Sequence, residues 1–204
     1  PEAAALALQL ALIQGRTLPR LEQPQMVVFA ADHGLAARGV SAYPSDVTWQ
    51  MVENFLAGGA AVTVLARQHG IGMTVVDCGV AHDFAPRPGL QIRKVGYGTA
   101  DCSTEPAMSR EQCEQALTHG IELVKGLPGN VLLLGEMGIG NTSPASLILA
   151  RLGGLDIADC TGAGTGLDQP GIVRKTDVLR EVLLRHAFET LALPAVWGIC
   201  HPDN

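Results

Sequence analysis

The segment Leu132–Ser146 reads LLLGEMGIGNTSPAS and passes from an apolar run through a glycine-rich turn into a helix-forming stretch. The apolar run is typical of a buried strand, and Pro144 suits the first turn of a helix, where its missing N–H is not needed. A strand that enters a helix through a short turn is the repeating step of a parallel α/β sheet. A lone glutamate, Glu136, stands between the strand and the turn.

Two earlier segments also contain an apolar run that is followed by an acidic residue and a glycine. They are QMVVFAAD (Gln25–Asp32), before His33 and Gly34, and GMTVVDCGV (Gly72–Val80). Helical stretches follow these runs, and Ser109 with Gln112 forms a capping box that predicts a helix to about Lys125. Alternating helices and near-continuous apolar strands are typical of parallel sheets that are buried on both faces. The sequence therefore predicts an α/β fold with a doubly wound, mainly parallel sheet flanked by helices, in a single domain over residues 1–204.

Composition favours a small-molecule partner. The chain has a net charge of -6, contains no basic run and is only 4% aromatic. These features exclude a basic surface for binding nucleic acid or an anionic membrane, and they exclude an aromatic surface for stacking the bases of single-stranded nucleic acid. We expect no nucleic-acid or membrane partner.

Cysteine usage indicates a reducing compartment. The cysteines are scattered, odd in number and never spaced as CxxC, so we expect free thiols and no disulfide or zinc framework. No apolar run reaches the roughly 18 residues of a membrane span. We therefore expect a cytoplasmic protein. The cysteines are Cys78, Cys102, Cys113, Cys160 and Cys200.

Polar groups follow each of the three apolar runs, at Asp32–His33, at Asp77 and at Glu136. Ligands of open parallel sheets bind beyond the carboxyl ends of the strands, so these groups should converge on one site. Glu136 is either an anion near the helix start that accepts from backbone N–H groups or a group aimed at a ligand. For the second role we expect partial burial, which would raise its pKa and suit a general base. Asp32 and His33 alone do not make a metal site, and we expect no metal.

Two glycine-rich turns could hold a phosphate. Gly138 and Gly140 precede a helix whose N-terminal N–H groups can face an anion. The segment TGAGTG at residues 161–166 could form a second cradle, with Lys175 supplying a point charge. The alternative is that these glycines serve only turn geometry and packing.

A second alternative is dinucleotide binding. The spacing Gly138-x-Gly140-x-x-Ser143 comes near the fingerprint of such sites, with Asp156 and Asp159 placed for a ribose contact. This near match would indicate an NAD-binding oxidoreductase.

Long motifs in the chain resemble one family. They are VVFAADHGLAARGVSAYPSDVTWQMVENFLAGGAAVTVLARQHG (27–70), TVVDCGV (74–80), GTADCSTEPAMSREQCEQAL (98–117) and the opening segment. Together they resemble the nicotinate-nucleotide–dimethylbenzimidazole phosphoribosyltransferases. The resemblance implies transfer of 5-phosphoribose from nicotinate mononucleotide to 5,6-dimethylbenzimidazole, giving α-ribazole 5'-phosphate and nicotinate in cobalamin biosynthesis. It also implies a homodimer and neither cofactor nor metal.

The resemblance also implies roles for individual residues. Glu136 corresponds to an active-site glutamate of the family. Phosphate contacts fall on Gly138, Gly164, Gly166 and Lys175. Substrate-binding positions, some of them in the benzimidazole pocket, fall on Asp32, His33, Ser41, Tyr43, Gln50, Met51 and Asn141.

Compared with that family, the sequence is expected to be truncated at both ends, with residues 1–15 forming a helix of the family's smaller helical part. The absent C-terminal part carries the family's principal general base, so a non-catalytic nucleotide-binding remnant is the alternative to an active enzyme. Residues 188–192 still resemble the family but residues 193–204 do not, and we hypothesise a frameshift at this point. Sequencing the gene with its downstream DNA tests this hypothesis.

Overall fold

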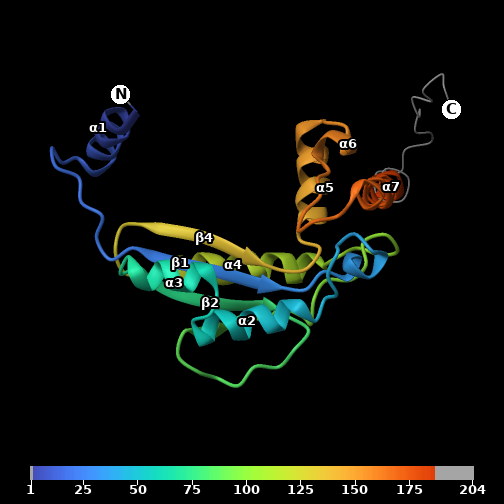
Figure 1. Cartoon of the computed structure of the whole chain (residues 1–204), viewed down its shortest axis with the longest axis horizontal. Helices are drawn as coiled ribbons and strands as arrows, with labels where there is room; N and C mark the ends of the chain where they lie inside the picture. The colour runs from blue at the N-terminus through green and yellow to red at the C-terminus, as the bar shows by residue number, and fades with distance from the viewer. Residues whose placement is uncertain (1, 187–204) are drawn as a thin grey trace.

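The computed structural model describes residues 2–186 (Figure 1); the segment of the frameshift hypothesis lies outside them. Its centre is a four-stranded sheet in the order β3-β2-β1-β4. The strands are β1 (Gln25–Ala31), β2 (Gly72–Gly79), β3 (Leu90–Ile92) and β4 (Leu132–Met137). Every pairing is parallel, which confirms the predicted fold class.

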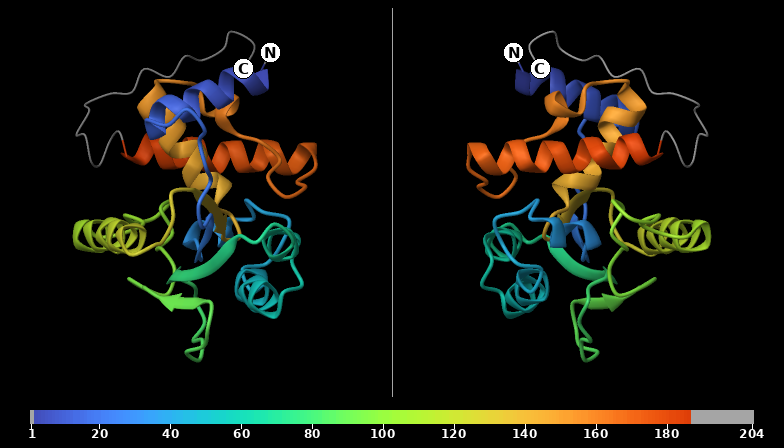
Figure 2. Two further views of the ribbon diagram at one scale, coloured as in Figure 1. Left: turned by 90° about the vertical axis from the view of Figure 1, so that its left-hand side faces the viewer. Right: turned by 90° about the vertical axis from the view of Figure 1, so that its right-hand side faces the viewer.

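Helices cover both faces of the sheet. Figure 2 shows α2 (Val47–Ala57) and α3 (Ala61–Gln68) on one face and α4 (Arg110–Lys125) on the other. The chain winds outward from β1 to β2 and β3, then crosses over through α4 to place β4 on the other side of β1. The carboxyl ends of β1 and β4 therefore flank the topological switch point, where open α/β sheets bind ligands.

The predicted capping box begins α4. The Ser109 hydroxyl accepts a hydrogen bond from the Gln112 backbone N–H, and the Gln112 side chain accepts one from the Ser109 N–H. These bonds satisfy N–H groups that a helix start leaves without partners.

Three further helices lie at the end of the sheet toward which the strands point (Figure 1). They are α5 (Thr142–Gly153), α6 (Ile157–Cys160) and α7 (Gln169–Arg185). They form a second apolar cluster that reaches the short 3-10 helix η1 (Gly34–Arg38) after β1. Its buried members are Leu35, Val40, Ala150, Ile157 and Leu179.

Two features of the sheet differ from the prediction. The run that forms β4 was expected to be buried, yet β4 is one of the two edge strands of the sheet and its Leu134 is 67% exposed. Strand β3 was not predicted, because three residues within a long polar passage carry no readable periodicity.

The first helix, α1 (Glu2–Gln14), lies within the predicted residues 1–15 but buries none of its residues. The segment after it is tied to the start of β4 by Asn130, whose side chain accepts from the Glu22 N–H and donates to the Arg20 carbonyl. Within residues 2–186, no helix combines the length and the apolar character needed to cross a membrane.

Candidate functional site

A cavity of about 280 Å³ lies at the switch point, between the loops that follow β1 and β4. The glycine-rich segment between α6 and α7 forms its third side. Among the predicted site residues, it brings together Ser41, Glu136, Gly138, Asn141 and Gly164. The complete lining is Val40, Ser41, Glu136, Met137, Gly138, Ile139, Gly140, Asn141, Thr142, Ala163, Gly164 and Thr165.

The Glu136 carboxylate is oriented by a neighbouring amide. Glu136 is exposed at the end of β4, so the expected partial burial was wrong. The Asn141 side-chain N–H₂ donates a hydrogen bond to Glu136 Oε2. Asn141 occupies the N-cap of α5, where it makes no side-chain capping bond. Its side chain therefore holds Glu136 in place and leaves the start of α5 uncapped.

The turn after β4 is fixed by close backbone packing. A Cβ on Gly138 would lie 2.3 Å from the Ala31 carbonyl oxygen and 3.0 Å from His33 Nε2. Only glycine therefore lets the ends of β1 and β4 approach each other here. The buried Ile139 N–H donates to Thr48 Oγ1 at 3.1 Å, which anchors the turn to α2. Packing is thus a sufficient reason for Gly138, and its phosphate contact stays a prediction.

Lys175 is fully buried behind one side of the cavity. Its ammonium donates to Thr142 Oγ1 at 2.7 Å and to the Gly162 carbonyl at 3.2 Å. Burial lowers the pKa of this ammonium. No ion pair within residues 2–186 includes Lys175, although a buried charge ordinarily requires an opposite charge nearby.

Thr142 is a cavity residue that the sequence reasoning missed. It is the first residue of α5 and follows Asn141 directly. A hydroxyl residue just after a glycine turn and at a helix start was the available signal, since such residues can reach an anion at the helix N-terminus.

Only one of the two predicted phosphate-binding glycines in residues 161–166 lines the cavity. Gly164 lines the cavity at φ +56, and a Cβ there would lie 3.2 Å from Thr142 Oγ1 and 3.8 Å from Lys175 Nζ. Gly166, at φ +110, faces open space and does not line the cavity. Asp156, considered as a ribose contact, instead caps α6 by accepting from the Ala158 N–H.

Asp32 and His33 lie at the end of β1 but do not line the cavity. Asp32 is buried, and its Oδ2 accepts from the Ala81 N–H at 2.8 Å, which joins the ends of β1 and β2. Burial lowers the pKa of the His33 imidazole, against the opposing influence of the Asp32 and Glu136 carboxylates. No cluster of three metal-ligating side chains occurs among the residues that the structure describes.

The predicted acceptor-pocket residues are dispersed. Only Ser41 lines the cavity, whereas Tyr43 is 52% exposed and Gln50 is exposed to solvent. Met51 packs against the core cluster between α2 and the sheet. Their roles stay predictions.

The chain was compared with known protein families. Residues 3–198 match the phosphoribosyltransferase family. The chain belongs to this family.

Two curated members of the family are nicotinate-nucleotide–dimethylbenzimidazole phosphoribosyltransferases. The one from Variovorax paradoxus (strain S110) is 65% identical over 94% of this chain and 55% of its own length. The one from Dechloromonas aromatica (strain RCB) is 55% identical over 88% of this chain and 53% of its own length. The chain thus spans about half the length of the curated relatives it matches.

The family fold is also evident in a solved structure. The crystal structure of CobT from Thermus thermophilus matches with a TM-score of 0.83 and 44% identity. The match covers 89% of this chain and 55% of that one.

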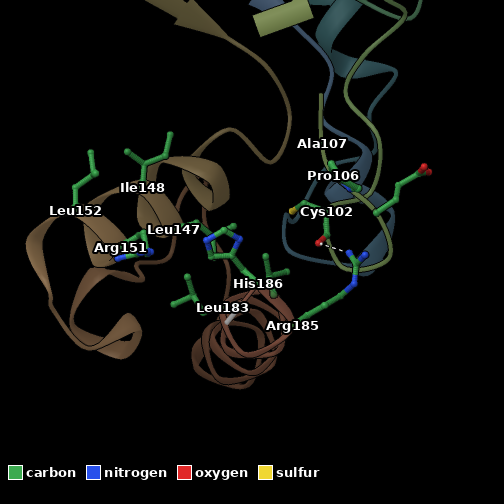
Figure 3. Close-up of a pocket in the computed structure, with 12 residues that line it drawn as sticks. Cys102, Pro106, Ala107, Leu147, Ile148, Arg151, Leu152, Leu183, Arg185 and His186 are labelled. Carbon is green, nitrogen blue, oxygen red and sulfur yellow. Dashed lines mark hydrogen bonds between the residues drawn. The ribbon is translucent and has the colours of Figure 1, made fainter. Parts of the chain in front are cut away.

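A larger hollow of about 620 Å³ lies elsewhere in this family member, between α5, α7 and the segment around Cys102 (Figure 3). Leu147, Ile148 and Leu183 line it, and Arg185 donates to the Cys102 carbonyl at its edge. Its lining includes none of the predicted site residues. The cavity at the switch point is therefore the better candidate for the family's chemistry.

Proposed function

We propose that this chain carries the site that transfers 5-phosphoribose from nicotinate mononucleotide to 5,6-dimethylbenzimidazole, giving α-ribazole 5'-phosphate and nicotinate in cobalamin biosynthesis. Family membership and the names of the relatives support the reaction. One structural observation carries the assignment. An oriented carboxylate, Glu136, shares a cavity with the start of α5, and behind this helix start the ammonium of Lys175 has no carboxylate partner within residues 2–186.

The proposed chemistry needs a carboxylate at this place. Nicotinate leaves with the electron pair of its glycosidic bond, and the ribose becomes cationic in the transition state. The Glu136 carboxylate, held by Asn141, would stabilise that charge electrostatically. The ring nitrogen of the azole that carries no proton then bonds through its lone pair to the ribose carbon, and the N–H proton of the other ring nitrogen passes to a base.

The nucleotide phosphate would lie at the start of α5. There the N-terminus of α5, the segment around Gly164 and the charge of Lys175 together favour an anion. Gly138, Gly164, Gly166 and Lys175 are the proposed phosphate residues. The proposed substrate-binding residues are Asp32, His33, Ser41, Tyr43, Gln50, Met51 and Asn141.

A product assay with purified chain tests the reaction. Chromatography should detect α-ribazole phosphate, and Glu136→Gln should lower its rate by at least about a hundredfold, since the transition-state charge loses its counter-charge. Glu181→Gln, which alters an exposed carboxylate on α7, should leave the rate unchanged. Product formation that is equally fast in Glu136→Gln would refute the role of Glu136.

Nucleotide binding without turnover is the second candidate. Glu136 is the only ionisable side chain lining the cavity in the described part of the chain, whereas the reaction needs both charge stabilisation and a proton acceptor. Saturable binding of nicotinate mononucleotide without product would select this candidate.

We further propose that the protein is cytoplasmic and forms a homodimer, with no nucleic-acid partner. Exposed apolar residues on α1, among them Leu8, Leu12 and Ile13, support association, because large apolar patches are unusual on monomers. Analytical ultracentrifugation tests the dimer, and a single monomeric species would contradict it.

A further inference from the structure

We propose that the His33 imidazole receives, through Glu136, the proton that the azole loses in the reaction. The reaction itself rests on the proposed function. The pairing of His33 with Glu136 rests on the register of β1 and β4. Of the residues proposed above to bind substrate, His33 would therefore act indirectly, since it does not line the cavity.

The proposed reaction leaves a proton on the ionisable side chain of the cavity. Within the described residues, Glu136 alone among the lining side chains can take up the azole proton. A protonated carboxyl group would stabilise the next ribose cation poorly, because its negative charge is gone. Glu136 must therefore pass its proton on, and a base behind it would receive the proton within the protein.

The strand register places His33 beside Glu136. In the parallel ladder between β1 and β4, Glu136 pairs with Phe29. The backbone is still extended at His33, with φ -123 and ψ 119. Because side chains alternate between the two faces of an extended chain, His33, an even number of residues after Phe29, shares the face on which Glu136 lies.

Gly138 leaves room for the His33 ring on that face. Gly138 is the second residue after Glu136, so a side chain at this position would lie on the same face as Glu136. A Cβ there would lie 3.0 Å from His33 Nε2 and 3.1 Å from His33 Cδ2. The imidazole thus fills the place next to Glu136 that a side chain at residue 138 would otherwise take. Residues two apart in a strand lie about 7 Å apart, and the Glu136 side chain or one bridging water molecule can span that distance.

The His33 ring is in a suitable state to accept a proton. Burial lowers the pKa of the imidazole, so the ring is neutral at neutral pH. Among the imidazoles of residues 2–186, only that of His119 makes a hydrogen bond, to the Arg93 carbonyl. The His33 nitrogens therefore lose no partner within this part of the chain when they bind a proton.

Two carboxylates stabilise the imidazolium that forms. Asp32 and Glu136 are the charged groups whose fields act on His33, and both favour its protonated form. Asp32 Oδ1 is also buried without a hydrogen bond among the described residues. The nearest arginine or lysine along the chain, Arg38 on η1, is paired with Asp101 at 2.6 Å. The surroundings of His33 are therefore suited to a positive charge.

The proton moves in two steps, which together form a relay. The azole N–H bond breaks as an O–H bond forms on Glu136, and that O–H bond then breaks as an N–H bond forms on His33. The imidazolium finally releases the proton to water, so the site returns to its starting charge.

The pH dependence of product formation tests the relay. In the parent chain the rate should rise with pH between about 5 and 7, as His33 becomes neutral. His33→Gln places an amide where the imidazole lay but binds no proton. It should lower kcat at about pH 8 by at least about tenfold and should remove the rise with pH.

The Michaelis constant and a second histidine provide the controls. In His33→Gln, KM for nicotinate mononucleotide should stay within about twofold, because His33 does not line the cavity. His69→Gln alters an exposed imidazole at the end of α3, and should change neither kcat, KM nor the pH dependence.

NMR titration of the imidazole signals tests the pair without turnover. The signal lost in His33→Gln, or in His33→Asn if the first variant does not fold, identifies His33. Its pKa in the parent chain should lie below the usual 6.5. In Glu136→Gln the titration midpoint should move to lower pH by roughly 0.2–0.7 of a pH unit, since a carboxylate that favours the imidazolium is removed. The midpoint of His69 should not move.

The two experiments separate this inference from the proposed function. Product formation with unchanged kcat and pH dependence in His33→Gln would overturn the relay and leave the reaction standing. A His33 midpoint that is the same in Glu136→Gln would overturn the pairing on which the relay depends. No product from the parent chain, with a midpoint that still responds to Glu136→Gln, would reject the reaction and the azole as proton source, but would keep Glu136 and His33 as a coupled acid–base pair.

Discussion

Two largely buried lysines lie near the carboxyl ends of the strands and differ in their partners. Lys94 Nζ lies 3.2 Å from Asp77 Oδ2, donates to the Val80 and His82 carbonyls, and lies 4.3 Å from the centre of the Tyr97 ring. Within residues 2–186, Lys175 Nζ donates to one hydroxyl and one carbonyl and pairs with no carboxylate. The first lysine therefore has its counter-charge inside the protein, whereas the second has none in this part of the chain.

The environment of Asp77 explains why the first pair is structural. Asp77 is fully buried at the end of β2, and its Oδ1 accepts from the N–H groups of Gly79 at 3.0 Å and Val80 at 2.8 Å. Lys94 neutralises the other oxygen and also holds the carbonyls of the following loop. The charge of Asp77 is therefore matched within the protein by Lys94, although Asp77 Oδ2 accepts no hydrogen bond among the described residues.

The largest expected effect is on stability, at the paired lysine. Lys94→Met leaves the Asp77 carboxylate buried without its counter-charge, and should lower the free energy of unfolding by about 3–5 kcal/mol. Urea denaturation measures this change. Arg110→Met, which breaks the exposed pair with Glu114, is the matched control and should cost about 0.3–0.5 kcal/mol. Equal losses in the two variants would mean that the Asp77 pair is not structural.

The unpaired lysine should show the opposite behaviour. Lys175→Met removes a buried charge that no carboxylate compensates, so its loss of stability at neutral pH should be far smaller than that of Lys94→Met. Burial lowers the folded-state pKa of Lys175 below its usual 10.5. At pH values between the folded-state pKa and 10.5, the unfolded state binds more protons than the folded state. Lys175 therefore lowers the free energy of unfolding below the folded-state pKa, and this loss of stability disappears as the pH rises to about 10.5.

The parent chain should therefore gain stability relative to Lys175→Met as pH rises from neutral toward about 10.5. Thermal unfolding of both chains over that range measures the difference. Lys125→Met, at the end of α4, is the control for general alkaline effects, because Lys125 is exposed. Parallel curves for the parent chain and Lys175→Met would show that the ammonium is not penalised by burial.

The sequence was sufficient to predict that three polar residues lie at the same edge of the sheet. Asp32, Asp77 and Glu136 each follow an apolar run, and strand ends of a parallel sheet share one edge. What each residue does there depends on contacts that no local pattern contains. The sequence does not show that Asp77 meets Lys94 or that Asp32 accepts from Ala81, because loops that cross between strands make these contacts.

The errors have the same origin. Partial burial was considered for Glu136 because it stands between an apolar strand and a glycine turn, but β4 is an edge strand and Glu136 is exposed. Gly138 suggested phosphate, and that contact stays a prediction; the sequence does not show that the Ala31 carbonyl across the sheet also requires glycine there. Thr142 was missed because its significance depends on Lys175, which lies on a different helix.

The smallest expected effect concerns thiol chemistry beside the paired lysine. Burial and the neighbouring Asp77 charge raise the pKa of the Cys78 thiol to about 11, whereas Cys113 is exposed on α4. At pH 8 only about one Cys78 in a thousand would be the reactive thiolate. Iodoacetamide followed by peptide mass spectrometry should therefore label Cys113 long before Cys78 in the folded chain.

Comparable labelling of Cys78 and Cys113 would mean that the end of β2 opens readily, and that Lys94 does not close it. The same experiment on Lys94→Met sharpens the comparison. Without its counter-charge the Asp77 carboxylate repels a thiolate more strongly, which lowers the intrinsic reactivity of Cys78. Faster labelling of Cys78 in Lys94→Met would therefore mean that the loop after β2 has opened, and not that the thiol has become more acidic. It would show that the Asp77–Lys94 ion pair keeps Cys78 inaccessible.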